Sequence, residues 1–338
     1  MSSVGIIANP ASGKDIRRLV ARSSVFDNNE KVAILRRLLI GLDAIGVEAA
    51  YIMPDYYGLG ERAADGLTLN MAISLLPMAV QADERDTVEA AGRLADMGVG
   101  CLVTLGGDGT NRAAAKTCGQ LPLLAISTGT NNVVPAMVEA TVAGLAAGLL
   151  ATGAVDAETV SQTSKRLEVF VDHEFMDIAL VDVAVSSDLF VATRAVWDPS
   201  RIKEIVLSRA EPGSIGLSSI GSAIHPIALQ DDCGLHLVIG EGGTAALAPV
   251  APGLVVPIPL RGTRVIALDT EVELEPCVGM LALDGERCLA LYPEQRVAVR
   301  LTRHGPRIVD MRACLAEAAR GGVFQGPMLA EVCDGYRD

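Results

Sequence analysis

The residues best suited to catalysis form the pentapeptide Gly106-Gly107-Asp108-Gly109-Thr110. It follows the apolar run 101–105 and precedes a helix-like stretch over 111–118. Glycines at a strand end let the backbone turn sharply and approach a ligand, and the free N–H groups of the next helix favour an anion. A carboxylate beside phosphates binds magnesium or accepts the proton of an attacking hydroxyl. We therefore expect Asp108 to be catalytic in phosphoryl transfer, in preference to an ordinary Asp-Gly turn.

Two other turns contain residues suited to phosphate. Thr128-Gly129-Thr130-Asn131-Asn132 follows a strand predicted over 121–127, and Asn9-Pro10-Ala11-Ser12-Gly13-Lys14 follows one predicted over 4–8. The turn at 128–132 should lie at the same edge of a sheet as the turn at 106–110, since both follow strands that run in the same direction. Helix capping is an equally good reading of Asn131 and Asn132. Lys14 is predicted equally well as a phosphate contact or as a solvated lysine. The phosphate-loop pattern is incomplete, because Ala8 replaces its first glycine and Asp15 replaces its Ser or Thr.

Composition bounds the class of protein. A chain of 338 residues, half of them apolar, predicts two domains with a core each. The net charge of −13 argues against nucleic acid or an acidic membrane face as a partner. Seven scattered cysteines without zinc-type spacing read as reduced thiols of a cytoplasmic protein, and we expect no bound structural metal. We also expect no secretory signal and no transmembrane segment.

The first predicted domain, residues 1–157, has the pattern of a parallel sheet with covering helices. Strands are predicted over 4–8, 49–53, 101–105 and 121–127, helices over 31–45 and 83–97, and a long loop over 55–69. The Ala-rich stretch within 133–155 suits a buried helix.

The second predicted domain, residues 158–306, is rich in short alternating strands. These are expected over 166–171, 174–186, 235–240, 244–249, 264–268, 272–275, 280–283, 288–291 and 296–301, with one helical piece over 197–210. A third segment, 307–338, begins with a helix that could pack back on the first domain.

Together these motifs resemble the superfamily of NAD kinases and diacylglycerol-type lipid kinases, most closely its acetoin catabolism protein X branch. The Asn-Pro-x-Ser-Gly turn at 9–13, the GGDGT signature at 106–110 and the G-T-x-N loop at 129–132 carry the resemblance. It implies that phosphate or nucleotide is bound by Asn9, Ser12, Gly13, Lys14, Gly106, Gly107, Gly109, Thr110, Thr128, Gly129, Thr130, Asn131 and Asn132.

The β-rich half also contains motifs that resemble those of the superfamily. Residues 179–186 resemble the segment that carries an Asn-Glu/Asp pair in NAD kinases, 212–226 their glycine-serine motif, and 283–286 the D-G-E turn of the superfamily. The resemblance implies acceptor binding by Asp182, Gly213, Ser214 and Asp284. On local sequence alone, Asp284 reads slightly better as part of a hairpin turn.

Two departures weaken the case for NAD. Val181 stands where NAD kinases have the Asn that helps to hold the dinucleotide, and Ile215-Gly216-Leu217 replaces their Thr-Ala-Tyr. A buried hydrogen-bonding partner that becomes apolar costs about 1 to 3 kcal/mol of selectivity.

The sequence therefore predicts an ATP- and Mg²⁺-dependent kinase with its site in a cleft between the α/β and β-rich domains. NAD is the leading acceptor by resemblance. The alternatives are another small hydroxylated metabolite or a non-catalytic nucleotide-binding regulator linked to acetoin catabolism, and a lipid acceptor ranks lower. We expect a homo-oligomer whose ligand is a small nucleotide or metabolite.

Overall fold

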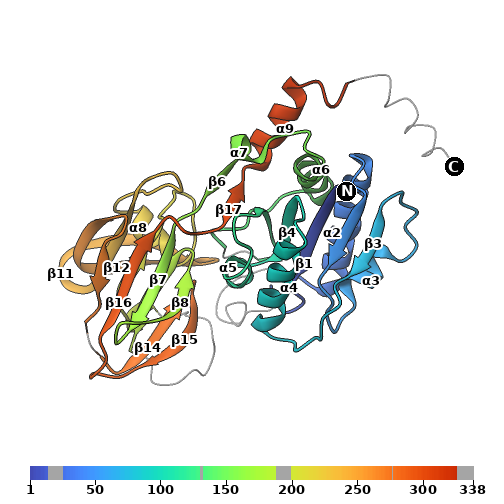
Figure 1. The fold of residues 1–338 in the computed structure, drawn as a ribbon. Coiled ribbons are helices and arrows are strands. Elements are labelled where there is room, and N and C mark those ends of the chain that lie inside the picture. The colour runs from blue at the N-terminus through green and yellow to red at the C-terminus, as the bar shows by residue number, and fades with distance from the viewer. Residues whose placement is uncertain (14–25, 130–131, 188–198, 276, 326–338) are drawn as a thin grey trace.

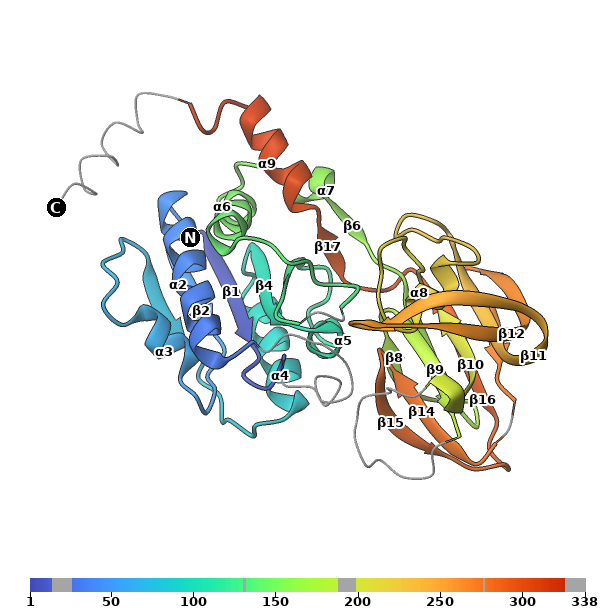
Figure 2. The same cartoon turned by 180° about the vertical axis from the view of Figure 1, so that it is seen from behind.

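The computed structural model describes residues 1–13, 26–129, 132–187, 199–275 and 277–325 (Figure 1). Three of the predicted phosphate-binding residues, Lys14, Thr130 and Asn131, lie outside these ranges. Two parts of the chain lie side by side, one built on a mostly parallel sheet and one on antiparallel sheets (Figures 1 and 2). The predicted fold class is thus confirmed.

The first part is built on a seven-stranded sheet in the order β3-β2-β1-β4-β5-β17-β6. The neighbouring pairs from β3 to β17 run parallel, and β6 is antiparallel to β17. The strands are β1 (Ser3–Ala8), β2 (Ala49–Ile52), β3 (Ala72–Leu75), β4 (Cys101–Gly106), β5 (Pro122–Ser127), β6 (Ser161–Thr163) and β17 (Arg307–Val309).

Helices cover both faces of this sheet, because successive strand residues point to opposite sides. On β1, Ile6 faces a core formed with α2 and α6, whereas Ile7 faces a core formed with α4. The helices of this part are α2 (Asn28–Ala44), α3 (Leu59–Ala64), α4 (Glu84–Asp96), α5 (Asp108–Ala115), α6 (Ala140–Ala151), α7 (Ala157–Val160) and α9 (Met311–Arg320). None of the described helices is long and apolar enough to cross a membrane.

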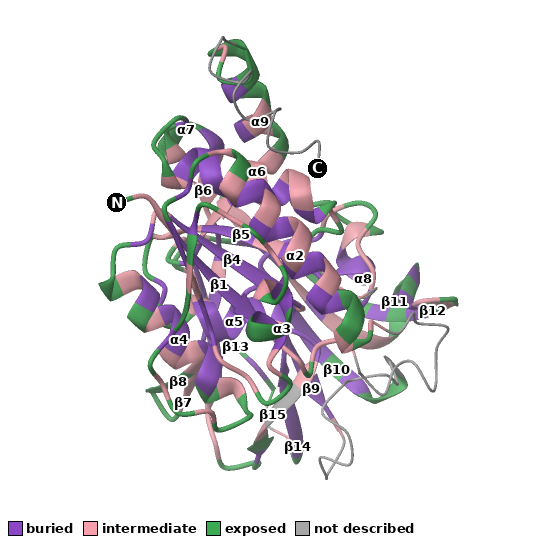
Figure 3. Cartoon of the chain, turned by 90° about the vertical axis from the view of Figure 1, so that its right-hand side faces the viewer, coloured by how far each residue is buried: buried purple, intermediate pink, exposed green. Residues whose placement is uncertain are grey.

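The second part contains a six-stranded sheet, β12-β11-β10-β9-β14-β15, and a four-stranded sheet, β13-β16-β7-β8. An apolar core lies between the two sheets, and a second core lies under α8 (Ser218–Ser222). The strands are β7 (Arg166–Val171), β8 (Glu174–Ala179), β9 (Asp182–Ser186), β10 (Ile202–Leu207), β11 (Cys233–Ala251), β12 (Leu254–Ala267), β13 (Glu271–Glu273), β14 (Gly279–Leu283), β15 (Glu286–Leu291) and β16 (Val297–Thr302). Figure 3 shows the purple, buried strands of the first part beneath its helices.

The helix predicted over 197–210 is wrong for the residues that the structure describes. Residues 202–207 form β10, a central strand of the six-stranded sheet, after one short 3₁₀ turn at Pro199–Arg201. The side chains of Ile205, Val206 and Leu207 are all fully buried. Such a run fits a strand covered on both faces, and this tertiary burial overrides the local helix-like spacing of Ile202, Ile205 and Val206.

Other elements also differ from the prediction. Strand β3 was not predicted, and the single strand predicted over 174–186 is divided into β8 and β9. Helix α3 occupies the middle of the expected loop 55–69, and residues 307–309 form β17 before the final helix begins at Met311. Strand β12 includes residues 254–260, which were not predicted as a strand and which contain Pro257 and Pro259. Proline is tolerated there because β12 is the edge of its sheet.

The end of the described chain returns to the first part. Strand β17 pairs with β5, and α9 places the buried thiol of Cys314 3.6 Å from the carbonyl oxygen of Ala146 on α6. Burial raises the pKa of the Cys314 thiol to about 11, so this cysteine packs as a neutral side chain.

Candidate phosphoryl-transfer site

The glycine turn places Asp108 at the first position of helix α5. Strand β4 ends at Gly106, Gly107 is the N-cap, and α5 begins at Asp108. A Cβ on Gly106 would lie 2.4 Å from Thr110 Oγ1, so the turn needs glycine there. Asn111 fixes the helix to the strand, because it accepts from Thr104 Oγ1 at 2.7 Å and donates to the Gly107 carbonyl at 2.9 Å.

The carboxylate of Asp108 joins the glycine turn to the loop after β5. It accepts the backbone N–H of Val133 at 2.9 Å and that of Val134 at 2.7 Å. These hydrogen bonds fix the carboxylate where the glycine turn meets the loop after β5.

Side-chain hydrogen bonds hold the three predicted phosphate turns together. Asn9 Nδ2 donates to Thr110 Oγ1 at 2.9 Å, and the hydroxyls of Ser12 and Thr128 lie 2.7 Å apart. Asn132 Nδ2 donates to Ser127 Oγ at 2.8 Å. The structure thus brings together most of the described residues that the sequence predicted for phosphate binding.

Lys31, on α2, supports the first of these turns and was missed in the sequence. Its side chain is fully buried, and Nζ donates to the carbonyl oxygens of Asn9 (2.9 Å), Pro10 (3.1 Å) and Ser12 (2.7 Å). An ammonium group held by carbonyl oxygens fixes the turn and places positive charge beside it. The helical pattern of α2 hid this residue, because a lysine between apolar positions reads as a solvated side chain.

The second part presents a β-hairpin turn to the same region. Asp284 and Gly285 join β14 to β15 with φ values of 50° and 74°, as in a type I′ turn. The fully buried Asp284 carboxylate accepts the backbone N–H groups of Leu180 (3.0 Å) and Val181 (2.8 Å). Asp182 reciprocates by accepting the N–H of Gly285 at 3.2 Å. The predicted hairpin turn therefore describes the backbone of Asp284. Its carboxylate also holds the backbone of the turn between β8 and β9 through Leu180 and Val181.

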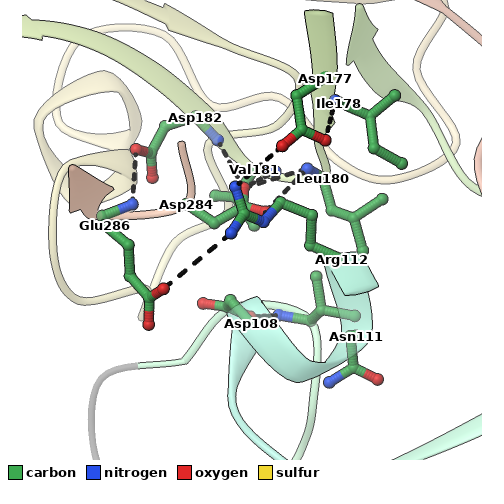
Figure 4. Close-up of polar contacts among 12 residues, drawn as sticks. Asp108, Asn111, Arg112, Asp177, Ile178, Leu180, Val181, Asp182, Asp284 and Glu286 are labelled. Carbon is green, nitrogen blue, oxygen red and sulfur yellow. Dashed lines mark hydrogen bonds and ion pairs between the residues drawn. The ribbon is translucent and has the colours of Figure 1, made fainter. Parts of the chain in front are cut away.

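Arg112 lies between the two parts and was also missed in the sequence. It follows Asp108 by one helical turn on α5, and its side chain is 2 % exposed. Its guanidinium lies 4.0 Å from Asp284 Oδ2, 4.0 Å from Glu286 Oε2 and 3.9 Å from Asp177 Oδ2 (Figure 4). Helix α5, which begins with Asp108, is thus linked to the second part by the ion pairs of Arg112.

Burial and these charges together set the protonation of Asp284. Burial raises its pKa to about 6, opposed by the positive charge of Arg112 and reinforced by the negative charge of Asp108. One turn further along α5, Lys116 Nζ lies 2.8 Å from Asp177 Oδ1 and 2.6 Å from Glu84 Oε1. Partial burial opposes the charged form of Lys116, but its hydrogen bonds to Asp177 and Glu84 raise its pKa.

Other residues predicted to bind the acceptor have structural contacts. Ser214 donates its hydroxyl to the Glu211 carbonyl at 2.6 Å within its own loop, and Gly213 has a φ of 88°, which favours glycine. The side chain of Val181 is 1 % exposed and packs in the core. Among the described residues of the second part, Asp177, Asp284 and Glu286 lie within ion-pair distance of Arg112 on α5.

Glu286 lies against the glycine turn. A Cβ on Gly109 would lie 3.2 Å from Glu286 Oε1, so glycine lets the second part come against the start of α5. Asp108 and the hairpin 284–286 therefore lie on facing elements, as Figure 4 shows. Among the described residues, no group of three or more His, Cys, Asp or Glu side chains is arranged to hold a metal ion.

Comparison with known proteins agrees with this two-part architecture. Residues 4–155 match the ATP-NAD kinase N-terminal domain family, and residues 165–304 match the acetoin catabolism protein X C-terminal domain family. The chain is 39 % identical to acetoin catabolism protein X from Cupriavidus necator over 331 residues, which cover 94 % of this chain and 92 % of that protein. The chain therefore belongs to the acetoin catabolism protein X family, with an N-terminal domain of the NAD kinase type.

Proposed function

We propose that this protein transfers the terminal phosphoryl group of ATP to a hydroxyl group of a small acceptor. One observation carries the proposal. Asp108 begins α5 among three turns held together by side chains, and its carboxylate lies opposite the hairpin of the second part. In such a site Asp108 accepts the proton of the attacking hydroxyl, while backbone N–H groups of the glycine turns bind phosphate oxygens.

Magnesium, when bound with ATP, would neutralise charge on the phosphates. Magnesium is commonly held by one or two carboxylates together with phosphates and water. Asp108 fits this pattern, because it is a carboxylate at the end of β4 beside the phosphate turns. The proposal needs no dedicated cage of protein ligands.

The acceptor is the finer part of the proposal. The domain match favours NAD. The side chain of Val181 is buried, and the carboxylates of Asp182 and Asp284 accept backbone N–H groups. Side chains used in this way contribute less to holding a large dinucleotide, so these contacts favour a smaller hydroxylated metabolite. The same contacts support the second candidate function, a nucleotide-binding regulator without turnover that is linked to acetoin catabolism, as the name of the relative suggests.

The test follows phosphate transfer from labelled ATP to NAD, NADH, coenzyme A derivatives and small diols in the presence of magnesium. Asp108→Asn should lower turnover by about 10²- to 10⁴-fold, since the amide cannot accept the proton. The matched control is Asp86→Asn. Asp86 is also buried and accepts two backbone N–H groups, from Gln81 (2.8 Å) and Ala82 (2.7 Å), in a turn that contains none of the phosphate-loop residues.

The control should resemble Asp108→Asn in stability and wild type in turnover. Wild-type turnover by Asp108→Asn would refute the catalytic role. ATP binding without transfer to any acceptor would instead favour the regulator. Thermal shifts with the same panel separate these cases, because a ligand that binds only the folded state raises its stability.

A further inference from the structure

The ends of β11 and β12 form an apolar arm that the proposed site does not use. We define the arm as residues 244–260, which pair beyond a register shift at 240–243 and run from Thr244 opposite Leu260 to Ala251 opposite Leu254. Residues 245–260 include no charged side chain and none that can form a hydrogen bond. In Figure 2 the ribbon of β11 and β12 crosses in front of the second part, and in Figure 3 it lies at the edge of that part.

The two faces of the arm have different surroundings but the same chemistry. The inner face is buried against the core under α8 through Ala246, Ala248, Ile258 and Leu260. The outer face is exposed, with Leu247 67 % and Val255 57 % exposed. Its members are Ala245, Leu247, Pro249, Val255, Pro257 and Pro259. A strand pair with one solvated face normally alternates apolar and polar residues, whereas apolar residues on both faces are typical of strands covered on both sides.

The edge of the arm is closed to strand addition. Strand β12 is the last strand of its sheet, and Pro257 and Pro259 have no N–H to donate to a further strand. A partner is therefore expected to cover the outer face and not to extend the sheet.

We propose that this outer face is a self-association surface that packs against the arm of a second copy of the chain. The proposal is independent of the kinase function. Two copies with a net charge of −13 each repel one another, and the arm is a surface where they can meet without bringing carboxylates together. The face is also self-complementary, since Leu247 and Val255 lie diagonally across the two strands. A two-fold axis through the face places Leu247 of each copy beside the partner's Val255.

The size of the face sets the strength of the contact. Seven residue pairs at about 3.3 Å per residue give a ribbon of about 23 Å by 10 Å. Allowing for side-chain relief, each copy buries on the order of 300 to 400 Å², about half of the roughly 800 Å² per partner in a standard interface. The arm alone therefore predicts a weak, reversible dimer that dissociates on dilution.

Sedimentation velocity of the full chain tests this proposal, over loadings from about 1 µM to about 200 µM, since interfaces of this size are reversible. Wild type should shift from the monomer mass of 35.2 kDa toward twice that value. Leu247→Asp and, on the other strand, Val255→Asp should each weaken the dimer at least about tenfold, because a charge is buried in an apolar contact. Circular dichroism should show both variants folded, since the outer face contacts no core.

The matched control is Met137→Asp, which adds the same charge at a side chain that is 58 % exposed in the first part. It should associate like wild type. Added salt should strengthen the dimer, because it screens the repulsion between the acidic copies without weakening an apolar contact. A wild-type chain that remains monomeric at the highest loading, or a Leu247→Asp variant that dimerises as wild type does, would overturn the proposal.

Discussion

Replacing Arg112 with methionine should destabilise the protein in a pH-dependent way. Methionine keeps much of the side-chain volume but removes the positive charge that lies 4.0 Å from the buried Asp284 carboxylate. At that separation, and with an effective dielectric constant of about 20, the attraction is about 4 kcal/mol. Because the side chain of Asp284 is fully buried, solvent screening reduces this figure little.

Protonation of Asp284 limits the stability that Arg112→Met loses. The folded-state pKa of Asp284 is about 6, above the ordinary 3.8, so the folded protein holds this proton more tightly than the unfolded chain does. This group therefore lowers the wild-type free energy of unfolding as pH rises from about 4 to about 6. Without Arg112 the pKa rises further, and the variant keeps the proton at about pH 8. At about pH 8, two units above the folded-state pKa of about 6, protonating Asp284 costs about 2.7 kcal/mol. This cost is smaller than the direct attraction, so the variant protonates Asp284 and the cost of protonation sets the loss of stability.

We therefore expect Arg112→Met to lose about 2 to 3 kcal/mol more stability at about pH 8 than at about pH 5. Urea unfolding at both pH values measures this difference. Arg112→Lys should retain most of the pH-dependent part, and Arg93→Met, which removes a half-exposed arginine paired with Glu89, should show little pH dependence. The double variant Arg112→Met with Asp284→Asn should also lose the dependence. An equal destabilisation by Arg112→Met at both pH values would refute this reasoning.

Two other substitutions test the phosphate turns and the acceptor side. Gly13→Ala places a Cβ 2.4 Å from the Thr128 carbonyl oxygen at a φ of +71°, so it should destabilise the first turn by more than the roughly 1 to 2 kcal/mol of the left-handed conformation alone. Calorimetry should then show weaker ATP binding, and unchanged binding would indicate that this turn does not contact phosphate. Val181→Asn buries an amide in the core at a position that is 1 % exposed, and should lower stability by about 1 to 3 kcal/mol without strengthening NAD binding. Tighter NAD binding by this variant would show that residue 181 reaches the ligand.

The sequence by itself determined the elements that present the phosphate turns. Strands β1, β4 and β5 were predicted within a residue or two, because buried parallel strands read as short apolar runs that end in glycine or polar residues. The parallel direction of β4 and β5 then implied that the two glycine turns share one edge. The structure adds the turn at 9–13 to this edge through the contacts of Asn9 with Thr110 and of Ser12 with Thr128.

Tertiary structure alone decided which charged side chains meet. Arg112, Lys31 and Asp177 come from a helix, a second helix and a distant strand, and local pattern treats each as a solvated charge. Their burial and their contacts depend on how α5 and the hairpin 284–286 pack across the two parts. The same holds for β10, whose helix-like spacing was overruled by burial on both faces, and for β12, where an edge position tolerates two prolines. Sequence periodicity records the burial of each element separately, whereas charge pairing and edge position are set by contacts between segments far apart in the chain.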